Sequence, residues 1–133
     1  MRIIAAVLVA AGLSGCSSLA PGRRLHRSES IPEAVGVVSF KALSADETLI
    51  ELRVRRLSDP ERLTPPGYAY VTWVRSTPND AAQNVGSLWL DSDLDGELRT
   101  VAPLRRFELF VTAEPSGDAE KPTGERLLWA TRD

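Results

Sequence analysis

From residue 34 onward, apolar and polar positions alternate with a period of two, which is the period of a half-buried β-strand. The segment 48–57 is the clearest case, because Ile50, Leu52 and Val54 alternate with charged residues. A helix is disfavoured there, since its apolar positions would recur at every third or fourth residue. Comparable segments, separated by turn residues, lie at 35–40, 68–75, 85–91, 97–102, 105–114 and 126–132.

This series of short strands, with no helical pattern between them, predicts one all-β domain over residues 34–133. We expect an immunoglobulin-like antiparallel β-sandwich of about seven strands. Trp73 falls on the third strand, where such sandwiches often bury a tryptophan, but the cysteine pair of antibody domains is missing. A small β-barrel is the alternative architecture.

The first 15 residues have a different pattern. Arg2 precedes an apolar run at residues 3–13, and small residues follow it. The run is too short to cross a bilayer core, which takes about 20 helical residues, and its order is typical of an export signal. We therefore expect a helical signal peptide over residues 1–15, cleaved between Gly15 and Cys16. The alternative is a buried helix of a cytosolic domain, but the run is apolar on every face.

Residues 13–16, Leu-Ser-Gly-Cys, resemble the bacterial lipobox, and Cys16 is the only cysteine of the chain. The resemblance implies that the Cys16 thiol receives a diacylglycerol group and that the residue becomes the acylated amino terminus. It also places the domain outside the cytoplasm, lipid-anchored on the periplasmic side of the cell membrane or outer membrane. In some bacteria an aspartate directly after the lipidated cysteine retains a lipoprotein in the inner membrane. Here that position is Ser17, which favours the outer membrane.

Residues 16–33 contain proline, glycine and serine, a basic cluster at residues 23–27 and no strand alternation. We expect a flexible tether that holds the domain away from the bilayer. The basic cluster offers contacts to anionic lipid headgroups, but a solvated linker is the favoured interpretation.

Composition excludes several classes of function. The 16 basic and 18 acidic residues are mixed along the chain and leave a net charge of −2, which argues against nucleic-acid binding. His26 is the only histidine and falls in the expected tether, so neither a fixed catalytic base nor a transition-metal site is expected. No glycine-rich phosphate loop is present. We predict no enzymatic activity and no cofactor.

The segment 91–96, Asp-Ser-Asp-Leu-Asp-Gly, matches the first half of a calcium loop through Asp91, Asp93 and Asp95. The bidentate glutamate of that pattern would fall on Ala102, and strands rather than helices flank the segment. Asp-Gly is also a strong hairpin signal. A tight turn is therefore favoured, and weak calcium binding is the alternative.

Three aromatic residues are candidate contacts for a partner: Tyr68, Tyr70 and Trp89. The tyrosines occupy one face of their predicted strand. If Leu88 and Leu90 are buried, Trp89 is exposed and available for recognition of a protein or a carbohydrate. The favoured alternative is that Trp89 packs over the hairpin or under the loop at 76–84.

Three stretches in order, 67–75, 85–98 and 107–124, resemble the carboxy-terminal domain of anti-sigma-K-type factors. The resemblance implies an extracytoplasmic β-sandwich in which Glu114 pairs near Thr123 and Gly124, where the chain turns into the last strand. The chain departs from those factors because a lipidated signal replaces their sigma-binding and transmembrane parts, so sigma binding is not carried over.

The expected function is that of a membrane-anchored envelope lipoprotein whose domain binds an envelope protein. The alternatives are a structural lipoprotein without a ligand, a periplasmic domain that senses a small ligand or carbohydrate, and an accessory of an extracytoplasmic sigma/anti-sigma system.

Overall fold

The computed structural model describes residues 22–63 and 67–133. The expected signal peptide, the cleavage site at Gly15 and the lipidation site at Cys16 lie outside this part of the chain. Within it, no helix is both long enough and apolar enough to span a membrane.

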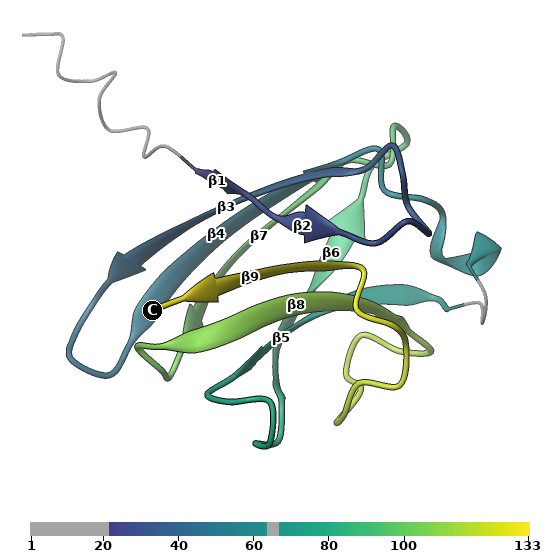
Figure 1. Ribbon diagram of the computed structural model, residues 1–133. Coiled ribbons are helices and arrows are strands. Elements are labelled where there is room, and N and C mark those ends of the chain that lie inside the picture. The colour runs from purple at the N-terminus through teal and green to yellow at the C-terminus, as the bar shows by residue number, and fades with distance from the viewer. Residues whose placement is uncertain (1–21, 64–66) are drawn as a thin grey trace, which may run out of the picture.

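The described chain is built from β-strands and one turn of 3-10 helix (Figure 1). The helix, η2, spans Pro60–Arg62. The strands are β1 (Arg23–Arg24), β2 (His26–Arg27), β3 (Val35–Ala42), β4 (Thr48–Arg55), β5 (Ala69–Arg75), β6 (Gln83–Leu90), β7 (Gly96–Ala102), β8 (Phe107–Glu114) and β9 (Leu128–Arg132).

All nine strands belong to one sheet, in the order β1-β3-β4-β7-β6-β5-β8-β9-β2, and its ladders are antiparallel. Only Leu25 separates β1 from β2, yet β1 pairs with β3 at one edge of the sheet and β2 pairs with β9 at the other. This short amino-terminal segment therefore connects the two edges and nearly closes the sheet into a barrel (Figure 1).

The prediction of an all-β, antiparallel domain is confirmed. A sandwich of two separate sheets is not observed, because β6 pairs with β5 along most of its length and with β7 at its end, which makes the sheet continuous. Alternation along the sequence reports which side chains face inward. It does not predict whether the last strands pair with the first. That pairing distinguishes a barrel from a sandwich.

The predicted tether over residues 16–33 is wrong for residues 22–33, and the domain begins before residue 34. The segment contributes β1 and β2 to the sheet, and the Leu25 amide donates to the Gly36 carbonyl at 2.9 Å. Leu25 and Ile31 are buried in the core. Strand pairing uses backbone groups, so a segment rich in arginine can pair without any apolar alternation.

The core lies inside the barrel, and a second, smaller apolar cluster lies outside it. Phe107, Leu109 and Val111 of β8 face inward, which is the alternation typical of a strand. Trp73 and Phe110 belong to the outer cluster, against Ala119 and Trp129. Trp73 is therefore buried as expected, but on the outer face of the sheet, by strand and loop residues, rather than between two sheets.

Candidate functional site

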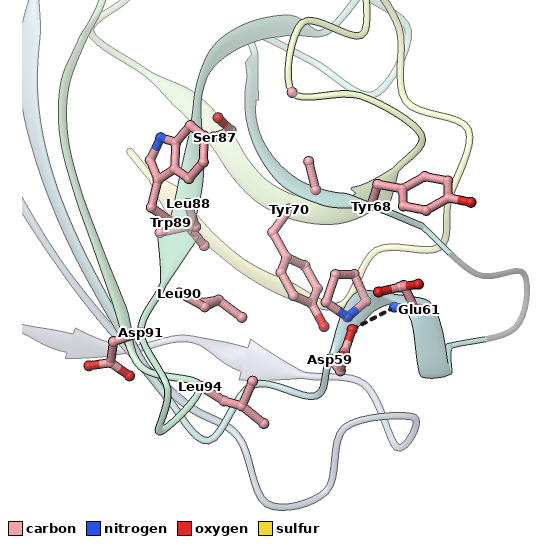
Figure 2. Close-up of a pocket in the computed structure, with 13 residues that line it drawn as sticks. Asp59, Glu61, Tyr68, Tyr70, Ser87, Leu88, Trp89, Leu90, Asp91 and Leu94 are labelled. Atoms are coloured by element: carbon pink, nitrogen blue, oxygen red, sulfur yellow. Dashed lines mark hydrogen bonds between the residues drawn. The ribbon is translucent and has the colours of Figure 1, made fainter.

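A groove of about 450 Å³ lies at the end of the barrel where β5 begins and β6 ends (Figure 2). Its apolar lining includes Leu88, Leu90 and Leu94. Further lining residues come from η2 and from the loop that joins β8 to β9. The groove is thus assembled from segments that are far apart in the sequence.

Trp89 stands at one flank of this groove with 84% of its surface exposed. Its position follows from strand alternation: the neighbouring Leu88 is buried opposite Tyr70, so Trp89 points outward. The favoured expectation, that Trp89 packs under the loop at 76–84 or over the hairpin, is wrong. The conditional prediction named Leu88 and Leu90 as the buried neighbours: Leu88 is buried, Leu90 is half-buried and Trp89 is exposed.

Tyr68 occupies the opposite flank and is 75% exposed (Figure 2). It precedes β5, which begins at Ala69, so its ring does not follow the alternation of that strand. The structure thus brings Tyr68 and Trp89 to one groove from two separate segments.

Tyr70 was expected to present the same face as Tyr68 to a partner, but its ring is buried. Its hydroxyl donates to the backbone carbonyl of Ser58. Burial of the phenol, together with the nearby charge of Asp59, raises the pKa of Tyr70 above its ordinary range. Tyr70 therefore belongs to the floor of the groove and is not an exposed contact.

The charged side chains that line the groove are all acidic: Asp59, Glu61 and Asp91. Asp59 also caps η2, since its Oδ1 accepts from the Glu61 amide at 3.0 Å. Asp59 and Glu61 were not among the residues expected at a contact site. An aspartate followed at once by proline is a signal for the start of a helical turn, but sequence spacing gave no reason to place that turn beside Trp89.

The aspartates of the calcium-like segment organise a tight turn. Asp91 Oδ1 accepts from the amides of Asp93 at 2.8 Å and Asp95 at 3.0 Å, and Asp95 Oδ1 accepts from the Arg56 amide at 3.0 Å. Leu94 adopts a φ of 65°, as tight turns require. Over residues 22–63 and 67–133, no group of three or more His, Cys, Asp or Glu side chains is arranged to hold a metal ion.

The loop between β8 and β9 contributes Gly117 to the groove and is fixed by Glu114. This buried carboxylate accepts from the Thr123 amide at 2.9 Å, the Thr123 hydroxyl at 2.6 Å and the Gly124 amide at 3.1 Å. Burial by itself would raise the pKa of Glu114, but the hydrogen bonds from Thr112, Thr123 and Gly124 outweigh it and lower the pKa. The expected pairing of Glu114 near Thr123 and Gly124 is confirmed.

His26 is not in a tether. It belongs to β2, and its ring stacks on Trp129 with 5.8 Å between ring centroids. It does not line the groove.

Neither a scan against models of protein families nor a search of curated proteins gives a match.

Proposed function

We propose that this chain is a bacterial envelope lipoprotein, anchored through an acylated Cys16, whose barrel is a non-catalytic interaction module. The groove between Tyr68 and Trp89 is its contact site. One observation carries the proposal: two large aromatic side chains, 75% and 84% exposed, flank an apolar groove. Aromatic side chains placed in this way are the typical anchors of recognition surfaces.

The position of the groove also supports this proposal. β1 runs antiparallel to β3, and Arg23 pairs with Val38 in the middle of β3, so the chain enters β1 from the direction of Ala42. The groove lies at the other end, where Gly96 pairs with Leu90 and Val54. In Figure 1, β1 lies at the left and η2 at the right. The described chain therefore enters the sheet from the direction opposite to the groove.

A second candidate function is an accessory role in an extracytoplasmic sigma/anti-sigma system. This candidate rests on the resemblance of the domain to the extracytoplasmic, immunoglobulin-like domain of anti-sigma-K-type factors. The contact of Glu114 with Thr123 and Gly124 favours this candidate, because the resemblance implied that pairing. A periplasmic carbohydrate-sensing domain is a third, and the exposure of Trp89 favours it.

The proposal is tested in a bacterial host with the full chain, by palmitate labelling and by photo-cross-linking from a photoreactive phenylalanine analogue at position 68, which keeps an aromatic ring there. Wild type is expected to incorporate palmitate, to fractionate with membranes and to form one discrete cross-linked adduct. Cys16→Ala is expected to lose the label and the membrane association. Trp89→Ala is expected to keep both and to lose the adduct, because it removes an anchor of the groove but not the lipid.

The matched control is Leu43→Ala, which truncates another exposed apolar side chain in the turn between β3 and β4. It should leave label, fractionation and adduct unchanged. A Cys16→Ala protein that still carries palmitate would disprove the anchor. An adduct that persists at full yield in Trp89→Ala would disprove the groove as the contact site.

A further inference from the structure

Arginine side chains lie over aromatic rings at several places in this molecule. In the described chain, Arg23 lies 5.3 Å from the ring centroid of Phe40, Arg75 lies 4.8 Å from that of Phe110, and Arg126 lies 4.3 Å from that of Trp129. A guanidinium at these distances is attracted by the face of the ring. Aromatic rings on three different strands are thus covered by cations of the same chain.

The two aromatic residues that flank the groove lack such a partner. Within residues 22–63 and 67–133, no arginine or lysine lies over Trp89 or Tyr68, and no Lys, Arg or His lines the groove. Arg53 and Arg55 lie in the hollow on the other side of Trp89, where Arg53 pairs with Glu97 at 3.4 Å, and neither guanidinium lies over the Trp89 ring. The ring faces of Tyr68 and Trp89 are therefore exposed to whatever enters the groove.

The carboxylates at the groove have acceptor capacity left. In the hydrogen bonds of the described chain, Asp59 and Asp91 accept through Oδ1 alone, and the Glu61 carboxylate accepts none. A carboxylate accepts hydrogen bonds and does not donate them. A sugar needs both donors and acceptors, whereas a guanidinium or an ammonium group only donates. These free acceptors therefore match a cationic group, which only donates.

We propose that the groove binds an arginine- or lysine-bearing segment of a partner protein. Tyr68 and Trp89 stack on the cationic groups, and Asp59, Glu61 and Asp91 accept their hydrogen bonds. This inference rests on the proposed role of the groove and gives its partner a chemical class. It does not depend on the lipid anchor.

The test uses residues 22–133, which contain the nine strands and both apolar clusters. The chain has three tryptophans, so an NMR spectrum of the ¹⁵N-labelled protein shows their indole N–H signals separately, and Trp89→Phe identifies the one from Trp89. The probe is the end-blocked peptide acetyl-Gly-Arg-Gly-Arg-Gly-amide. We expect it to shift the Trp89 signal in a saturable way and to bind more weakly at high salt.

Two comparison ligands test whether the groove selects cationic peptides. The matching peptide with glutamate in place of arginine, and the trisaccharide of N-acetylglucosamine, should leave the Trp89 signal in place. A Trp89 shift with the trisaccharide, or no shift with the arginine peptide, would overturn the inference.

Charge is tested with the triple variant Asp59→Asn, Glu61→Gln and Asp91→Asn, in which the amides keep an acceptor oxygen for the existing caps. The peptide should bind about tenfold more weakly, as expected for the loss of exposed ion pairs. Asp46→Asn, Glu47→Gln and Asp133→Asn make the same change of charge outside the groove and should have little effect. Equal weakening in both triple variants would contradict the inference. If the first variant does not fold, Glu61→Gln alone, whose carboxylate makes no cap, should still weaken binding.

The two proposals fail separately. If the peptide does not bind but the cross-linked adduct still requires Trp89, the groove is a contact site and its cationic specificity is wrong.

Discussion

Glu114 is a charged side chain with none of its surface exposed. It is stable there because its carboxylate replaces water with hydrogen bonds from Thr112, Thr123 and Gly124. The last two belong to the loop that crosses the outer face of the sheet toward β9. One side chain thus fixes a loop that covers Trp73 and contributes to the groove.

We predict that Glu114→Gln lowers the free energy of unfolding by about 2 kcal/mol at pH 7, because the amide turns a donor toward groups that are themselves donors. Urea denaturation of wild type and variant measures this loss. The matched control is Glu47→Gln, an exposed glutamate in the turn between β3 and β4. A loss in the control as large as in Glu114→Gln would contradict the prediction.

The same pair of proteins predicts a pH dependence. The pKa of Glu114 in the folded state is lowered from 4.5. A depressed pKa gives stability that is fully present above the unfolded value and is lost as the pH falls through the folded value. The difference between wild type and Glu114→Gln should therefore be largest near neutral pH and should shrink below pH 4.5.

At the scale of a single residue, alternation was enough to predict that Trp89 is exposed if Leu88 and Leu90 face inward, because neighbouring positions of a strand face opposite sides. It failed for Tyr68 and Tyr70. These residues are two apart, but only Tyr70 lies within a strand, so only Tyr70 is oriented by the sheet.

The smallest strands have the largest effect on the architecture. β1 and β2 contain two residues each, and between them Leu25 is buried against Gly36 and Leu128. The strands that they cover, β3 and β9, would otherwise be the two edges of the sheet. An uncovered edge exposes unpaired backbone groups and promotes aggregation.

We predict that Leu25→Ala destabilises the domain by about 2 kcal/mol, the lower part of the range for buried leucine, since 8% of its surface remains exposed. Thermal unfolding and light scattering measure the loss of stability and the aggregation that follows opened edges. Arg24→Ala, an exposed neighbour in β1, should change neither. A Leu25→Ala protein as stable as Arg24→Ala would show that this segment does not hold the edges together.

An irregularity in β6 also had no signal in the sequence. The pairing of β5 with β6 shifts between Thr72 and Trp73, next to Gly86, which adopts a φ of 141°. A side chain at Gly86 would be strained in that conformation and would lie 3.0 Å from Leu98. Glycine thus permits the irregularity in the pairing of β5 with β6.

For the whole molecule, β5 connects two apolar clusters. Its inward side chains, including Tyr70 and Val74, belong to the core of the barrel, and its outward side chains, Val71 and Trp73, belong to the outer cluster. A strand shared in this way couples the packing of both faces.

We predict that urea unfolds the domain in a single transition. Tryptophan fluorescence, which reports on the outer cluster through Trp73, and far-ultraviolet circular dichroism, which reports on the whole sheet, should give the same midpoint. The measurement uses the Trp89→Phe variant, because the exposed Trp89 would otherwise add a fluorescence signal that does not come from the outer cluster. Two separated midpoints would show that the outer cluster and its loop unfold independently of the barrel.

The sequence by itself determined the strands from residue 35 onward, the inward residues of β8 and the turn at residues 91–95, because alternation and turn chemistry are local properties of the chain. Tertiary structure alone decided that the sheet is continuous, that residues 22–33 belong to it, and that Tyr68, Trp89 and the acidic side chains form one groove. Those results depend on contacts between segments far apart in the sequence. These contacts are stabilised by backbone pairing between strands and by side chains that are buried together, and no short stretch of residues encodes either.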